Sequence, residues 1–312
     1  MPRPNRSKRP LRSRRGPETM LYSVRHRTTY RYDEPVSLSH HAAHLRPLDR
    51  HQQTCRSHQV MIEPLPTSLG ETSDYFGNRV TVFSIARPHQ SLIVESTSEV
   101  EMRPLALDPA VGRTAWERIA EAAAAPRDAD ALKSAEFSVA SPQADVTPVI
   151  RAFAAPSFAA GRPLIETTLD LAHRIYGEFK FDPTATTVST PTEEVLRLKR
   201  GVCQDFAHLM IAGCRSHGVP ARYVSGYLET DPPAGAAKRL VGADASHAWV
   251  AVHAGDGVWL EIDPTNDRLA GTSHIAVAEG RDYGDVSPLR GVILGGGDHV
   301  VEVAVDVERM LI

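Results

Sequence analysis

The segment 246–265 carries two apolar stripes in strict alternation around a short glycine-bearing turn. Its even-numbered apolar positions are Ala248, Val250, Val252, Val258, Leu260 and Ile262. Because successive side chains of a strand point to opposite faces, both stripes reach one core layer only if paired residue numbers add up to an even number. A three-residue loop at 255–257 meets this condition. It predicts an antiparallel hairpin in which Ala254 pairs with Val258 and His247 with Thr265.

The odd-numbered positions of this hairpin form a second face of polar and aromatic residues. It holds His247, Trp249, Trp259, Glu261 and Asp263. In the predicted register Asp263 lies diagonal to His247, within reach of its side chain. A carboxylate that accepts a hydrogen bond from an imidazole fixes the tautomer and stabilises the protonated ring. We therefore expect a hydrogen bond between His247 and Asp263.

A cysteine heads an apolar-periodic run in the stretch RGVCQDFAHLM at 200–210. The pattern predicts a helix that begins at Cys203 and ends near Gly218. The predicted buried face of this helix comprises Phe206, Leu209, Met210 and Gly213. At a helix N-terminus a sulfur meets unpaired N–H groups and the positive end of the helix dipole, which favour a thiolate. A buried small hydrophobe, a metal ligand and a nucleophile are the three roles open to Cys203 on this ground alone.

The 312-residue chain has only three cysteines, at positions 55, 203 and 214, and no CxxC. This pattern argues against a secreted disulfide framework and predicts a cytoplasmic protein. Cys214 lies about 16 Å along the helix from Cys203, too far for a disulfide or a shared metal, and is expected in the core. The sequence has no apolar stretch of about 18 residues, so we expect no membrane partner.

The net charge of −3 hides a basic tail. Residues 1–19 hold seven Lys and Arg and one acid; removing them from totals of 35 and 38 leaves 28 basic and 37 acidic residues. The tail has almost no apolar residues and is predicted to be disordered. It is either a dispensable extension or a segment that touches acidic surfaces. The acidic body argues against a nucleic-acid partner.

The pattern of periodicities predicts an α+β protein. Strand-like alternation in the first part places Val24, His26, Thr28 and Tyr30 on one face. An alanine- and proline-rich stretch with short helical pieces follows, and then a mixed core. The predicted parts are a disordered tail at 1–19, an antiparallel β-domain at 20–103, a helical connector at 104–162 and a core at 163–312.

A thiol at a helix N-terminus, a strand histidine and an orienting carboxylate are together the parts of a cysteine nucleophile triad. The stretches GVCQDFAHLM, GVPARYVSGYL, DASHAWV and WLEIDPTND closely resemble the bacterial branch of the transglutaminase-like superfamily, a papain-like cysteine fold. Residues 21–47 look like the β-rich region that precedes this core in bacterial members. The resemblance spans about residues 20–312. It implies Cys203 as nucleophile, His247 as general base and then acid, and Asp263 as the orienting carboxylate.

The resulting hypothesis is acyl transfer from an amide of a protein or peptide substrate through a thioester. Resolution by water would make the protein a protease or amidase, which we favour over a cross-linking transglutaminase. Two residues are predicted to contact substrate: Trp249, which shares the face of His247, and Tyr283, in the polar, glycine-rich stretch 280–285. The sequence has no DxDxDG pattern, so we expect no metal, and we expect no cofactor.

Two rival interpretations stay open on the sequence. Cys203, His247 and Asp263 could instead be the ligands of a zinc hydrolase, although no short-range ligand pair accompanies the cysteine. Alternatively, the chain is a non-catalytic binding module that retains the fold. The oligomeric state is not indicated.

Overall fold

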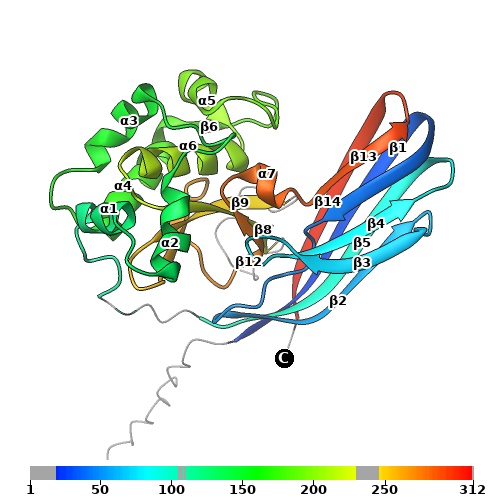
Figure 1. The fold of residues 1–312 in the computed structure, drawn as a ribbon, viewed down its shortest axis with the longest axis horizontal. Coiled ribbons are helices and arrows are strands. Elements are labelled where there is room, and N and C mark those ends of the chain that lie inside the picture. Colours follow the sequence, from blue (N-terminus) through cyan, green and yellow to red (C-terminus); the bar gives the residue numbers. More distant parts are fainter. Residues whose placement is uncertain (1–18, 105–107, 109, 230–245, 311–312) are drawn as a thin grey trace, which may run out of the picture.

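The computed structural model describes residues 19–104, 108, 110–229 and 246–310 and contains two main antiparallel sheets with a group of helices (Figure 1). One sheet stands beside the helical body, and the other lies inside it. The predicted α+β class is therefore confirmed. Residues 1–18 of the tail predicted to be disordered lie outside the described residues. Within the described ranges, no helix is both long and apolar enough to cross a membrane.

The first sheet is organised around one long strand. Its strands are β1 (Met20–Ala43), β2 (Gln53–Glu63), β3 (Ser68–Ser73), β4 (Arg79–Ile85), β5 (His89–Met102), β13 (Leu289–Gly295) and β14 (His299–Met310). β14 and then β13 run antiparallel along one edge of β1, while β5 and then β4 follow its other edge. β2 and β3 pair outside β5 and β4. Among the described strands, β1 alone joins the β13 and β14 side of this sheet to the β4 and β5 side.

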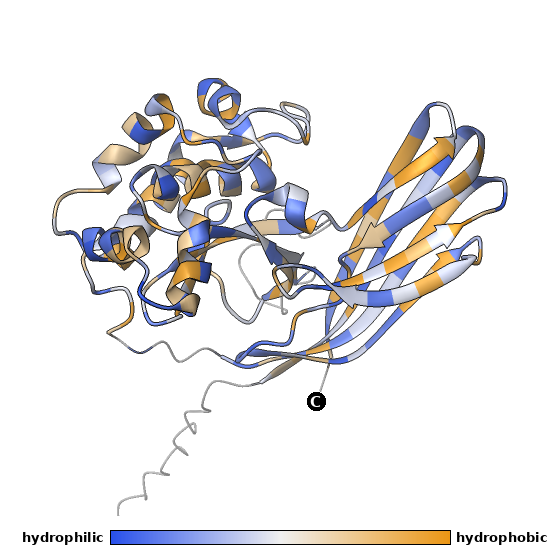
Figure 2. Ribbon diagram, viewed as in Figure 1, coloured by the Kyte–Doolittle hydropathy of each residue, from blue (hydrophilic) through white to orange (hydrophobic). Residues whose placement is uncertain are grey.

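Alternation along β1 follows the prediction. Val24, His26 and Thr28 are buried, Tyr30 is partly buried, and Arg25 between them is exposed. Figure 2 shows hydrophobic and hydrophilic segments in turn along the strands of this sheet. One face of the sheet is therefore the packed one, as expected for an antiparallel sheet with one solvated side.

The C-terminal strands correct the predicted division of the chain. Residues 289–310 were expected in the core at 163–312, but β13 and β14 pair with β1 in the first sheet. Strand alternation indicates that a segment is a strand and contains no information about which sheet it joins. Non-local pairing of this kind, here between residues 21 and 310, therefore lies beyond a reading of local pattern.

The second sheet carries the predicted hairpin. Its strands, in spatial order, are β11 (Arg268–Leu269), β10 (Trp259–Asp263), β9 (His247–His253), β8 (Ala221–Leu228) and β12 (His274–Gly280). Trp259 pairs with His253 and Ile262 with Val250, and the N–H of Ala254 donates to the carbonyl of Val258 at 2.8 Å. The predicted register is therefore confirmed.

Helices cover the face of this sheet that carries the even-numbered apolar stripes. They are α1 (Trp116–Ala124), α2 (Ala129–Ala135), α3 (Pro148–Ala154), α4 (Leu164–Glu178), α5 (Thr192–Leu198) and α6 (Cys203–Ser216). α6 packs on β8 and β9, while α3 packs on its other side. The predicted buried face of α6 was too narrow, because every residue at 205–216 is buried between the sheet and these helices.

The stretch predicted as a helical connector is part of this core. Ile119 of α1 and Ile150 and Ala154 of α3 belong to the same buried cluster as the residues of α6. A Cβ placed on Gly213 would lie 3.2 Å from the Cβ of Ala154, so α3 and α6 approach closely at this glycine. Residues 116–158 therefore support the helix that presents Cys203.

The two sheets are joined by an apolar cluster and by ion pairs. Tyr22 and Val24 of β1 pack with Tyr227 of β8 and Ile275 of β12. Next to this cluster Arg50, in the connection from β1 to β2, forms ion pairs with Glu261 and Glu279 of the second sheet. Since Glu261 is two residues before Asp263, the first sheet supports the strand that carries this carboxylate.

Candidate active site

Cys203 is the first residue of α6 and is partly exposed. The preceding residue, Val202, is extended, and its N–H donates to Oδ2 of Asp205 at 2.8 Å. The hydroxyl of Thr186 donates to the same oxygen at 2.6 Å. Asp205 is buried, and both of these hydrogen bonds are made to its carboxylate. It fixes the turn that places the sulfur at the helix end.

Gly201 allows Asp205 to close this turn. A Cβ at Gly201 would lie 2.5 Å from Oδ2 of Asp205. We expect Gly201→Ala to lower the free energy of unfolding by about 1–3 kcal/mol, measured by urea denaturation. The matched control is Gly177→Ala in α4, where nothing lies within 4 Å of the added Cβ. Stability should be unchanged or higher in this control, and equal effects of the two variants would contradict the role given to Gly201.

The predicted hydrogen bond between His247 and Asp263 is present. Nε2 of His247, at the start of β9, lies 2.9 Å from Oδ2 of Asp263, at the end of β10. Both side chains are fully buried. Since Asp263 holds Nε2, the other ring nitrogen, Nδ1, is the one left for a reacting group.

Cys203, like Asp263, changes the pKa of His247. Burial on its own lowers the pKa of His247, but the charges of Asp263 and Cys203, together with hydrogen bonding to both, outweigh it and raise that pKa well above its ordinary value. The pKa of Asp263 shows the converse. Burial raises it, while the charge and hydrogen bond of His247 and the hydrogen bond of His274 lower it far below the usual range. This environment favours an imidazolium facing a carboxylate on one side and the sulfur on the other.

The carboxylate of Asp263 has further donors that the sequence did not indicate. Oδ1 accepts the backbone N–H groups of Thr265 at 2.9 Å and Asn266 at 3.2 Å. Oδ2 accepts the side-chain amide of Asn266 at 2.7 Å, and His274 lies 3.1 Å from it. The contact of Asn266 could have been predicted from the sequence, since Asn266 follows Asp263 in the same turn. The contact of His274 could not, because the chain crosses the sheet from β10 to β12 before His274 reaches the site.

Trp249 lies beside both histidines and is fully buried. Its ring stacks on His247 at 6.1 Å between centroids and meets His274 edge-on at 5.3 Å. Its indole N–H donates to Glu261 at 2.7 Å. A ring with no exposed surface packs the histidines in place, so the structure gives Trp249 no open face for the predicted substrate contact.

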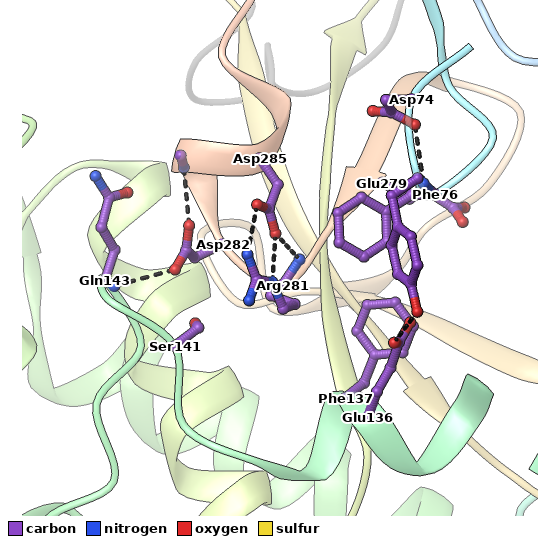
Figure 3. A network of polar contacts seen from close by, with 12 residues as sticks. Asp74, Phe76, Glu136, Phe137, Ser141, Gln143, Glu279, Arg281, Asp282 and Asp285 are labelled. Carbon is purple, nitrogen blue, oxygen red and sulfur yellow. Dashed lines mark hydrogen bonds and ion pairs between the residues drawn. The ribbon is translucent and has the colours of Figure 1, made fainter. Parts of the chain in front are cut away.

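Tyr283 begins the short helix α7 (Tyr283–Val286) and is partly buried. Figure 3 shows the contacts that hold this segment: Asp282 accepts the backbone N–H of Gln143 at 3.0 Å, and Arg281 pairs with Asp285 at 2.9 Å. The stretch 280–285 therefore leads into a helix start that side-chain contacts hold in place.

Tyr283 is linked to the cysteine through one intervening residue. Its backbone N–H donates to Nε2 of the buried His208 at 3.1 Å, and its ring lies edge-on to Tyr223 at 6.4 Å. Burial, and after it the charge of Cys203, raises the pKa of Tyr223 well above its ordinary value. Tyr283 thus lies beside the region of Cys203, and its contact with substrate stays a prediction.

The zinc alternative has little support in the donor set. Among the described residues, no three His, Cys, Asp or Glu side chains are grouped as metal ligands would be. Asp263 already accepts five N–H contacts on its two oxygens. A carboxylate has about four lone-pair positions, so this one has none free for a metal.

Comparison with known proteins agrees with this geometry. The family model of the bacterial transglutaminase-like N-terminal region matches residues 22–101, and that of the transglutaminase-like superfamily matches residues 151–264. An uncharacterized protein of Mycobacterium tuberculosis is 41% identical over 303 residues, 93% of each chain. The chain belongs to the transglutaminase-like superfamily. The superfamily match begins inside α3 and contains Cys203, His247 and Asp263.

Other members extend the comparison. An uncharacterized protein of Mycobacterium leprae is 35% identical over 289 residues, 92% of this chain and 98% of that one. The crystal structure of a candidate cysteine protease from Cytophaga hutchinsonii aligns with a TM-score of 0.75 at 21% identity, covering 95% of this chain and 92% of that one. This likeness shows that the two proteins share a fold over nearly the whole of both chains.

Proposed function

We propose that this superfamily member is a cysteine-dependent acyl-transfer enzyme that cleaves amide bonds through a thioester on Cys203. One observation carries the proposal. His247 is held by Asp263 through Nε2, and the charge and hydrogen bond of Cys203, at the start of α6, raise the pKa of the same ring. The nucleophile Cys203, the base His247 and the orienting carboxylate of Asp263 therefore follow one another in the order that covalent catalysis requires.

The steps follow from this arrangement. The thiolate of Cys203 attacks the amide carbonyl carbon, and the resulting oxyanion faces the unpaired N–H groups of the first turn of α6. The carbon–nitrogen bond breaks as the imidazolium of His247 gives its Nδ1 proton to the departing amine. Water then attacks the thioester, His247 takes a proton from it, and a carboxylic acid leaves with return of the sulfur. Asp263 stays ionised throughout and holds the ring.

Hydrolysis is favoured over cross-linking as the outcome. The sulfur of a partly exposed cysteine leaves the thioester open to water. The structurally similar protein of Cytophaga hutchinsonii is named as a candidate cysteine protease, which agrees with this outcome. We expect peptide or protein amides to be cleaved with and without an added primary amine. Mass spectrometry of a peptide library incubated with the enzyme distinguishes a hydrolysed product from an amine adduct.

The reactivity of the three cysteines tests the proposal without a known substrate. At roughly pH 6–7 we expect iodoacetamide to label Cys203 first, because the imidazolium stabilises its thiolate. Cys55 is also partly exposed and is the matched control: burial raises the pKa of its thiol, so it should react slowly. Cys214 is fully buried, and burial raises its pKa to about 12. Equal labelling of Cys203 and Cys55 would instead favour a non-catalytic binding module.

A further inference from the structure

Two histidines meet the same oxygen of Asp263, and only one of them can take part in proton transfer. His247 approaches Oδ2 at 2.9 Å and His274 at 3.1 Å, each through Nε2. The two rings differ in what their other nitrogen contacts. Nδ1 of His247 lies on the side of Cys203, while Nδ1 of His274 lies in a turn of the chain.

The turn fixes the tautomer of His274. The backbone N–H of Gly271 donates to Nδ1 of His274 at 3.3 Å, and the hydroxyl of Ser273 lies 3.2 Å from it. A backbone N–H is always a donor, so Nδ1 must be the unprotonated acceptor. The ring proton is therefore on Nε2, where it points at Asp263. The His274 side chain is buried, and its Nε2–H is a fixed donor to Asp263.

The surroundings of His274 hold it in this role. Trp249 packs edge-on against its ring, 5.3 Å between centroids. The other charged group near it is Glu261 of β10, which is engaged by Arg50 and by the indole N–H of Trp249. The charge of Glu261 is thus shared with other donors, and Asp263 is the acceptor that His274 contacts.

We infer that His274 is a positioning residue for the acyl-transfer reaction: it holds Asp263 toward His247 and moderates the basicity of the carboxylate. This inference rests on the proposed function. A carboxylate that loses a donor stabilises an adjacent imidazolium more strongly, so His247 would give up its proton less readily. Without the Nε2 donor, the carboxylate is also less well fixed, and the ring it orients is less well placed.

Two amide substitutions separate this role from a purely structural one. In His274→Asn the amide reaches the position of Nδ1, so it keeps the contact with Gly271 and loses the donor to Asp263. In His274→Gln the amide reaches the position of Nε2, so it keeps the donor and loses the contact with Gly271. We expect His274→Asn to lower kcat by about tenfold at unchanged KM and His274→Gln to stay close to the wild type. If His274 only stabilises the turn, the order of the two variants is reversed.

The pH dependence of Cys203 alkylation provides a readout that needs no substrate. In the wild type the rate should rise in two steps, first as the thiolate–imidazolium pair forms and then as His247 loses its proton. We expect His274→Asn to move the upper step to higher pH by about half a unit or more, and His274→Gln to leave it in place. An unmoved upper step in a folded His274→Asn variant overturns the inference alone. If the wild type lacks the lower step, the proposed function fails and the inference fails with it.

The tautomer can be checked in the unmodified protein, which covers the case of a variant that does not fold. Nitrogen-15 NMR of the histidine rings, recorded near neutral pH, should show the ring proton of His274 on Nε2, where it is donated to Asp263. A proton on Nδ1 of His274 would contradict the inference. His247 is the internal comparison, because its raised pKa means that it should be doubly protonated at the same pH.

Discussion

Replacing Cys203 with alanine is expected to remove amide cleavage, with kcat lower by at least about a thousandfold. The thioester cannot form without the sulfur, and His247 does not replace it as nucleophile. Cys203→Ser should be almost as inactive, since a hydroxyl ionises far less readily than a thiol. The measurement is single-turnover cleavage of a peptide identified in the library screen.

Cys55→Ala is the control for this loss. Cys55 lies on β2, is partly exposed like Cys203, and makes only a weak contact from its sulfur to the carbonyl of Ser57 at 3.4 Å. Cleavage should continue at the wild-type rate in this variant. Cleavage that survives in a folded Cys203→Ala protein, or that is lost with Cys55→Ala, would contradict the assignment of the nucleophile.

The second large effect is expected from Asp263→Asn, which keeps the size of the side chain and removes its charge. The charge of Asp263 raises the pKa of His247 against the effect of burial, so its loss lets burial lower that pKa. The imidazolium should then persist only at lower pH, and the alkaline limb of the kcat/KM profile should move to lower pH. We expect kcat to fall by about a hundred- to ten-thousandfold, measured from the same pH series.

Asp267→Asn is the matched control, four residues away. Asp267 pairs with His173 at 2.7 Å on the surface, and its φ of 51° suits asparagine as well as aspartate. Its replacement should leave kcat and both limbs of the profile unchanged. A profile in Asp263→Asn that overlays the wild type would show that the carboxylate does not govern His247.

The hairpin shows how much of this site local sequence pattern predicts. The alternating stripes fixed both the register of β9 and β10 and the face of His247, because a shift by one residue would have exposed the apolar set. With the register known, the bond from His247 to Asp263 followed from strand geometry alone. The start of α6 at Cys203 followed likewise from the change in periodicity after the Arg-Gly-Val turn.

Contacts between distant segments were not accessible in this way. His274 reaches Asp263 because the chain crosses the end of the second sheet, and Arg50 reaches Glu261 because the two sheets pack together. Strand periodicity is the same whichever neighbour a strand pairs with, so β13 and β14 were placed in the wrong part. Trp249 was placed correctly on the face of His247, but the sequence did not indicate that the ring of His274 packs against it.

The central claim is that the sulfur of Cys203 faces the Nδ1 side of His247. A short bifunctional alkylating reagent such as 1,3-dibromoacetone tests it directly. Each of two neighbouring nucleophiles displaces one of its bromides, so the reagent links them. If the claim is correct, digestion and mass spectrometry will recover the peptide of Cys203 joined to the peptide of His247 by the three-carbon bridge, and Asp263→Asn will reduce the yield. Single alkylation of Cys203 with no bridge to His247 in the folded wild-type protein would contradict the claim.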